Sequence, residues 1–137
     1  MGMDVLGKRP HDEKGEYFRA SIWEWRPIHE LIRELCTDLF DEEGLLHLAY
    51  NGGSGPADQE TCSEMAKRFS AWLKGFDGDK YFIEDSTLRV TRDGRLVSDK
   101  ETLGAPELVT ESAYSVDRET LADWIQFLDR CGGFEVW

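Results

Sequence analysis

Apolar residues recur at helical spacing in two long segments of the first half of the chain. From Ile28 to Leu39 they fall at i, i+3, i+4, i+7, i+8 and i+11, which predicts a helix with one continuous apolar stripe. Pro27 suits the first turn of this helix, where its missing N–H costs nothing. Asp58 is a good N-cap for a second helix, and Gly75 is its expected end. The apolar stripe of the second helix is Cys62, Met65, Phe69, Trp72 and Leu73.

A third helix is predicted near the end of the chain. Ser115 is its expected N-cap, and Gly132 with Gly133 marks its end because glycine rarely continues a helix. One face of this helix is apolar and is formed by Leu121, Trp124, Ile125 and Leu128.

Shorter segments have the features of β-strands. Thr87–Thr91 alternates polar and apolar residues, and Leu96-Val97 follows after Asp93-Gly94, a dipeptide favoured in tight hairpin turns. Helices and strands together predict an α+β fold, with three amphipathic helices packed on a small, mostly antiparallel β-sheet in a single domain over residues 1–137. The other expected strands are Met3–Gly7, Tyr81–Ile83 and Phe134–Trp137.

One segment, Tyr17–Trp25, fits neither the spacing of an amphipathic helix nor the alternation of a strand. It is rich in β-favouring aromatic residues but lacks clean alternation, so its secondary structure stays open at this point. The sequence also leaves open whether Trp23 and Trp25 belong to the core or to an interface, since tryptophan is common in both.

Composition adds an uneven distribution of charge. The chain has a net charge of −12, from 28 acidic and 16 basic residues. Residues 37–65 contain seven acids and no Lys or Arg, and residues 101–137 contain eight acids and two Arg. Such segregation is typical of an anionic face that meets a basic partner, although each tract is equally well explained as solvated helix faces and loops.

Several function classes fit poorly. A pI of about 4.6 argues against direct binding to nucleic acid or to an anionic membrane. No apolar run approaches the roughly 20 residues of a membrane span, and the first ten residues lack signal-peptide features. Three cysteines without a C-x-x-C pair suit a reducing compartment, so a cytoplasmic location is expected. Cys36 and Cys62 are expected to be inert core thiols, and Cys131 to be more exposed.

Several motifs resemble those of a family of small uncharacterised bacterial and phage proteins. Its pattern begins M-G-M-D-V-x-G-x-x-P and continues G-x-Y-F-R…W-x-W-R-P, which matches Met1–Pro10, Gly15–Arg19 and Trp23–Pro27. Asn51–Gly55 and Cys131–Phe134 are also similar. The resemblance implies a compact intracellular protein associated with a phage or mobile element, and implies no particular activity. Some members carry C-x-x-C-like elements suited to zinc, which this chain lacks, so no metal role carries over.

A glycine loop provides one candidate site. Leu45–Tyr50 is predicted to be an apolar strand, and a helix follows the loop, a layout that can cradle phosphate. The loop lacks the Lys and Ser/Thr of a P-loop, however, and Asp58 and Glu60 at the helix start would repel an anion. A turn is the simpler interpretation. The alternative function of a small enzyme or ligand-binding domain would use a pocket formed by His47, Asn51, Gly52, Gly53, Ser54 and Gly55.

The histidines do not form a catalytic set. His29 is expected on the exposed side of its helix, His11 in a charged loop, and His47 in an apolar run where a buried, hydrogen-bonded imidazole is the simpler interpretation. Nothing fixes a metal geometry for His47 with Asp41 and Glu43. No catalytic residue, metal site or cofactor is therefore predicted.

The leading functional hypothesis is a non-enzymatic acidic module that binds a basic protein. It is pictured as a phage or mobile-element inhibitor that presents carboxylates, in place of phosphates, to a nucleic-acid-handling or defence protein. A third hypothesis is a structural or assembly protein with an apolar oligomerisation face; the oligomeric state is left open. The candidate binding residues are Asp38, Asp41, Glu42, Glu43, Asp58, Glu60, Glu64, Asp117, Glu119, Asp123 and Asp129.

Overall fold

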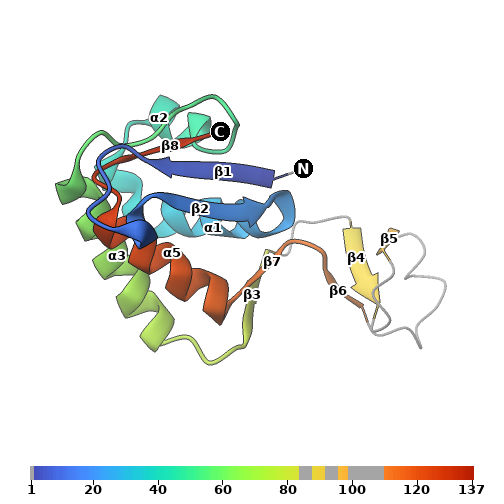
Figure 1. Cartoon of the computed structure of the whole chain (residues 1–137). Helices are drawn as coiled ribbons and strands as arrows, with labels where there is room; N and C mark the ends of the chain where they lie inside the picture. The colour runs from blue at the N-terminus through green and yellow to red at the C-terminus, as the bar shows by residue number, and fades with distance from the viewer. Residues whose placement is uncertain (1, 84–87, 92–95, 99–109) are drawn as a thin grey trace.

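The computed structural model describes residues 2–83, 88–91, 96–98 and 110–137. It confirms the α+β class: helices pack on small antiparallel sheets (Figure 1). The helices are α1 (Ile22–Cys36), α2 (Glu42–His47), α3 (Gln59–Lys74) and α5 (Arg118–Arg130), with 3-10 turns η1 (Glu13–Gly15) and η2 (Thr37–Leu39). The strands are β1 (Gly2–Gly7), β2 (Tyr17–Ser21), β3 (Lys80–Phe82), β4 (Leu88–Thr91), β5 (Leu96–Ser98), β6 (Thr110–Ser112), β7 (Ser115–Asp117) and β8 (Phe134–Val136).

The main sheet has the order β2-β1-β8, and both pairs are antiparallel. Val5 in β1 lies opposite Phe18 in β2 and Val136 in β8, and all three side chains are buried. Alternate residues point to opposite faces of a strand, so this register turns one face of the sheet into the core. α1 and α5 pack against that face, and α3 packs on both helices (Figure 1).

Trp124 of α5 stands at the centre of the core. Its ring lies 5.1 Å from that of Phe18 and 5.5 Å from those of Trp25 and Phe134, with edge-on contacts to the last two. Such tilted pairs are the favoured aromatic geometry. Trp25 is fully buried, and its Nε1–H donates to the carbonyl of Leu48 at 2.9 Å. Trp25 is therefore a core residue.

The remaining strands form two small sheets. β3 pairs with β7, and β4 lies between β5 and β6. β4 and β5 are antiparallel, which confirms the predicted hairpin pairing, while its expected turn at Asp93-Gly94 lies outside the described residues. The sheet of β4, β5 and β6 stands to one side of the helices (Figure 1).

The segment Tyr17–Trp25, whose secondary structure the sequence left open, contains β2 and the start of α1. Ser21 is the N-cap: its Oγ accepts the N–H of Glu24 at 3.2 Å, and the Glu24 carboxylate accepts the N–H of Ser21 at 2.9 Å. This capping box starts the helix at Ile22. The prediction that Pro27 occupies the first turn is thus wrong, because Pro27 lies in the second turn.

Two other sequence predictions are also wrong. α5 begins after Asp117, whose carboxylate accepts the N–H of Thr120 at 2.7 Å, whereas Ser115 belongs to β7. Leu45–Tyr50 is not a strand, since α2 ends at His47 and turns follow it. A helix begins before this run because Asp41 caps it by accepting the N–H of Gly44 at 2.6 Å. The expected cap of α3 is confirmed, since Asp58 accepts the N–H of Thr61 at 3.0 Å and Gly75 is its C-cap.

Candidate functional site

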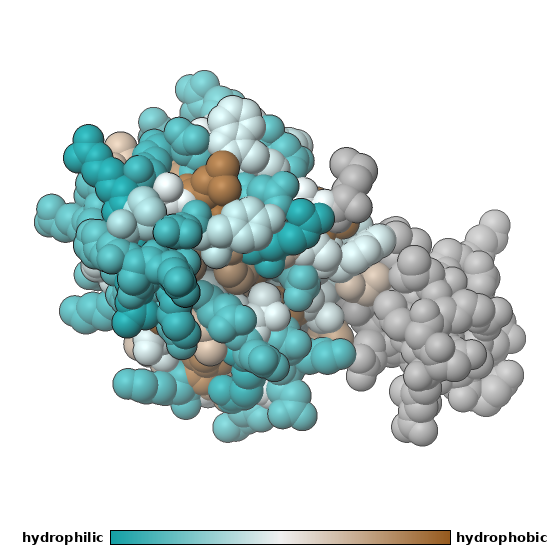
Figure 2. Space-filling view, viewed as in Figure 1, coloured by the Kyte–Doolittle hydropathy of each residue, from teal (hydrophilic) through white to brown (hydrophobic). Residues whose placement is uncertain are grey.

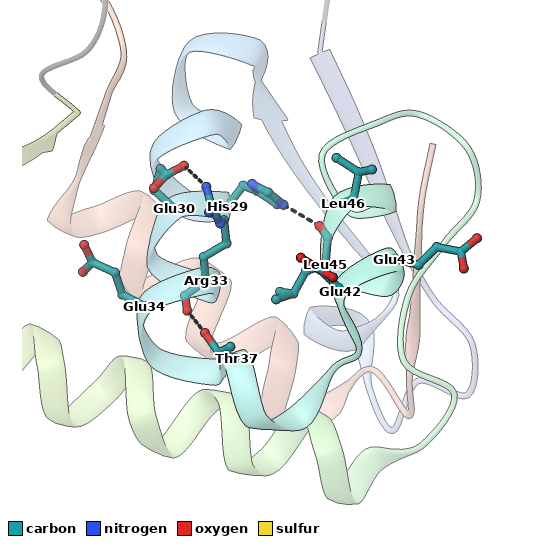
Figure 3. A pocket seen from close by; sticks show the side chains of 9 residues that line it. All are labelled: His29, Glu30, Arg33, Glu34, Thr37, Glu42, Glu43, Leu45 and Leu46. Carbon is teal, nitrogen blue, oxygen red and sulfur yellow. Dashed lines mark hydrogen bonds and ion pairs between the residues drawn. The ribbon is translucent and has the colours of Figure 1, made fainter.

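A groove of about 840 Å³ lies between α1 and α2 (Figure 3). Its apolar part is Leu45, which is buried, and Leu46, which is 56% exposed. The volume lies in the range of about 300–1,000 Å³ found for ligand pockets. The polar lining residues are His29, Glu30, Arg33, Glu34, Thr37, Glu42 and Glu43.

The α1 side of the groove carries a mixed row of charges. Glu30 and Glu34 are one turn apart and therefore lie near each other on the helix surface. Arg33 is held by Glu30 through an ion pair of 3.1 Å, and the main-chain carbonyl of Arg33 accepts the hydroxyl of Thr37. Figure 3 shows the carboxylate of Glu34 pointing away from α2. The guanidinium of Arg33 is thus already paired.

The charged lining residues on the α2 side are all acidic. Glu42 and Glu43 occupy the first turn of α2, where negative charge favours the positive end of the helix dipole. Both are exposed, and Glu43 points outward (Figure 3). Within the part of the chain that the structure describes, the side chains of Glu34, Glu42 and Glu43 make no ion pair or hydrogen bond. The lining therefore carries four carboxylates against one guanidinium.

His29 joins the two helices across the groove. It is half-buried rather than exposed as expected, and its Nε2 lies 2.7 Å from the carbonyl oxygen of Leu45. A carbonyl only accepts, so Nε2 is the donor of this hydrogen bond. The bond holds α2 against α1. His29 and Glu30 also line a second hollow of about 460 Å³, which extends the groove along α1 toward Arg26 and Tyr50.

A different cluster neutralises two of the predicted binding residues. Arg68 binds Asp38 through both terminal nitrogens, at 2.5 and 3.0 Å, and Glu64 through Nε at 3.1 Å. It also donates to the carbonyl of Leu35 at 2.8 Å. Hydrogen bonding to Arg68 lowers the pKa of Asp38. Asp38 and Glu64 are therefore brought together, with a cation between them.

Most of the other predicted acids lie at helix N-termini. Asp41, Asp58 and Asp117 are N-caps, and the main-chain N–H groups that they accept lower the pKa of Asp58 and of Asp117. Acids in a first helical turn suit the helix dipole. The first-turn acids are Glu42, Glu43, Glu60 and Glu119, whereas Asp123 and Asp129 are exposed further along α5.

The ends of α3 and α5 show which acids lie far apart. Gln59, at the start of α3, donates to the carbonyl of Leu128 near the end of α5 at 2.9 Å. Arg118, at the start of α5, donates to the carbonyl of Gly78, beyond the end of α3, at 2.8 Å. The helices are thus antiparallel, and the 16 residues of α3 span about 24 Å. The acids at the N-terminus of α3 and those at the N-terminus of α5 lie at opposite ends of this pair.

The glycine loop packs against the C-terminal strand. Ser54 bridges to Val136, and Gly53, with φ +80°, lies where a Cβ would come within 2.5 Å of the Trp137 ring. The amide of Asn51 donates to the carbonyls of Trp137 at 2.6 Å and Gly2 at 3.2 Å. The loop glycines therefore have a packing role.

The candidate residues of that loop do not converge on one hollow. Gly53, Ser54 and Gly55 line a hollow of about 280 Å³, which neither His47 nor Asn51 lines. Gly52 is exposed. His47 is exposed on α2, so the expectation of a buried imidazole is wrong.

The cysteines are all buried. Cys36 and Cys62 are core residues as predicted, and burial raises the pKa of Cys36 to about 11. Cys131 is fully buried as well, which corrects the expectation that it is exposed.

Among the described residues, no group of three His, Cys, Asp or Glu is placed to hold a metal ion. None of the helices in the described ranges combines the length and the apolar character that a membrane crossing requires. Comparison with family models, curated proteins and solved structures found no match.

Sequence reasoning missed Glu30, Arg33, Glu34 and Leu46 as members of the site. The i, i+4 spacing of Glu30 and Glu34 on the polar face of the first helix was a usable signal. The position of α2 against that face could not be predicted, because the apolar run that contains Leu46 was assigned to a strand.

Proposed function

We propose that this chain is a non-enzymatic module that binds a basic segment of a partner protein in the groove between α1 and α2. The observation that carries the proposal is the composition of the groove. The lining combines four carboxylates with two leucines, and its cation, Arg33, is already paired with Glu30. Glu34, Glu42 and Glu43 make no ion pair among the described residues, so a bound cation would displace no existing pair from them.

The two kinds of lining residue favour an amphipathic occupant. Leu46 is more than half exposed beside buried Leu45, so an apolar side chain of the partner would remove Leu46 from water. Lys or Arg side chains next to it would reach Glu42 and the other carboxylates of the lining. Burial would then slow dissociation, while the overall charge of −12 would speed encounter with a basic protein.

The proposal extends to the class of partner. A protein whose own ligand is nucleic acid has a surface rich in Lys and Arg, and carboxylates can occupy such a surface in place of phosphates. A nucleic-acid-handling or defence protein is thus the partner class that fits an acidic groove. Hydrophilic residues cover most of the face shown in Figure 2, which is the side of β1 and β2.

The experiment measures binding of a panel of fluorescent peptides in which Lys or Arg flanks a single Leu. The test variant, E34Q/E42Q/E43Q, removes three groove charges. Its matched control, E16Q/D123N/D129N, removes three exposed charges outside the groove lining. The groove variant is expected to bind at least about tenfold more weakly, and the control within about threefold of the original chain.

Affinity for the peptides should also fall with added salt, because Glu34, Glu42 and Glu43 are exposed and salt screens their charges. Equal weakening by both triple variants would show that general charge, not the groove, attracts the peptides. Failure of every peptide to bind at low salt would overturn the proposed function.

A further inference from the structure

The second hollow, of about 460 Å³, differs from the groove in its charge. The lining of the groove has four carboxylates, whereas the described lining of the second hollow has one, that of Glu30, beside the guanidinium of Arg26. Glu30 is already paired with Arg33 at 3.1 Å. The negative charge of the second hollow is therefore neutralised, and its positive charge is not.

Arg26 has no acidic partner among the residues that the structure describes. It lies one turn before Glu30, a spacing that favours an ion pair, but Glu30 pairs with Arg33 instead. The guanidinium carbon of Arg26 lies 4.7 Å from the ring centroid of Tyr114. A ring attracts the cation but supplies no carboxylate, so the guanidinium keeps N–H donors for one.

The cation is held at one wall of the hollow. The carbonyl of Tyr114 accepts the N–H of Ile83 at 3.2 Å, and Ile83 lines the hollow. The Tyr114 ring is itself supported by that of Trp23, at 5.0 Å between centroids. Tyr50, which is 60% exposed, lines the same hollow and brings a hydroxyl that can donate to an acid.

The two hollows are close enough for one extended segment to occupy both. His29 and Glu30 line both of them. His29 also marks where α2 meets α1, because its Nε2 lies 2.7 Å from the Leu45 carbonyl oxygen. Arg26 precedes His29 by about 4.5 Å of helix rise. Two residues of an extended chain advance by about 6.6 Å, and their side chains point the same way.

We propose that the second hollow is a carboxylate-binding subsite for the same partner segment, where Arg26 pairs with an Asp or Glu two positions from the apolar residue of that segment. This inference rests on the proposed function and adds a specificity to it. The net charge of −12 disfavours every acid in a ligand, so a preference for an acid at one position requires a local cation.

The experiment remakes the tightest-binding peptide of the panel with Glu, Gln or Lys two positions before or after its Leu. On the original chain, Glu at one of these positions should bind at least about threefold more tightly than Gln, and Lys should bind more weakly than Gln. Comparing peptides on the original chain needs no variant to fold.

Variants then identify the cation. Arg26→Met should bring the Glu and Gln peptides within about twofold of each other, and Arg26→Lys should keep part of the preference. The matched control, Lys67→Met, removes an exposed cation outside both linings and should keep the whole preference.

The outcomes separate this inference from the proposed function. Failure of every peptide to bind would overturn both. Binding of the basic peptides with no preference for Glu at either position would overturn the carboxylate subsite alone. A preference for Glu that persists in Arg26→Met would do the same.

Discussion

Carboxylates of the same kind have different surroundings in two neighbouring regions. Around Arg68, Asp38 and Glu64 share one guanidinium, which also binds the Leu35 carbonyl and joins η2 to α3. In the groove between α1 and α2, Glu34 and Glu42 have no such partner among the described residues.

This difference shows why the count of acids along a sequence does not locate a binding surface. The stretch from 37 to 65 has no base of its own, yet Arg68, just beyond it, neutralises part of its charge. Its two capping acids, Asp41 and Asp58, are committed to main-chain N–H groups. An acid is available to a partner only where the fold has not already given it a donor.

The largest expected effect concerns the acids committed to helix caps. The variant D41A/D58A/D117A should lower the free energy of unfolding by about 3 kcal/mol, since each cap contributes about 1 kcal/mol and the three helices are separate. Urea denaturation measures the loss. The matched variant D41N/D58N/D117N should retain most of the stability because Asn also caps helices. Equal losses in both variants would mean that charge, not capping, matters at these positions.

The next effect concerns the Arg68 cluster. Arg68→Met removes the partner of two carboxylates and leaves the Leu35 carbonyl without its donor, so the melting temperature should fall by roughly 3–5 °C. Arg33→Met, which removes a single exposed pair with Glu30, should change it by less than about 1 °C. A thermal melt followed by circular dichroism compares the two. Similar shifts in melting temperature for the two variants would contradict the expected difference between the Arg68 cluster and the groove.

A smaller effect concerns pH. The folded pKa values of Asp58 and Asp117 lie below the ordinary 3.8, because each carboxylate accepts a main-chain N–H. Their contribution to stability is therefore complete above that ordinary value and is lost as pH falls through the folded pKa. Urea midpoints measured from about pH 6 down to about pH 3 should decrease, and D58N/D117N should flatten the decrease. An unchanged slope in that variant would contradict the assignment.

The smallest effect on stability is expected in the groove itself. E34Q/E42Q/E43Q should change the free energy of unfolding by no more than about 1 kcal/mol, the part due to lost helix-dipole interactions of Glu42 and Glu43. The same variant has the large effect on peptide binding stated above. Urea denaturation beside the binding assay separates the two, and a large stability loss would place these acids among the structural ones.

The sequence pattern predicted the helices well where apolar spacing and a cap agreed. Asp58 and Gly75 mark the two ends of α3 as expected. It failed at α1 because aromatic residues favour strands on average, whereas the local S-x-x-E pattern of Ser21 and Glu24 starts a helix there. At Leu45–Tyr50 a short apolar run fits strand and helix equally, and the cap at Asp41 decided for helix.

The groove was beyond prediction for a different reason. Its two sides come from separate helices, and their relative position depends on a side-chain bond from His29 to the Leu45 carbonyl. Periodicity gives the face of each helix but not which faces meet. The apolar stripe of α1 therefore predicted which face of α1 is buried. The groove on its exposed face depends on where α2 packs, which the sequence pattern does not give.

The pairing of β1 with β8 has a consequence for how the chain folds. Val5 meets Val136, so the central strand of the main sheet acquires its second neighbour only when the last part of the chain has arrived. Closing so long a loop costs entropy that local helix formation cannot repay in advance. During synthesis, the edge of β1 that pairs with β8 therefore stays open until Phe134–Val136 has been made.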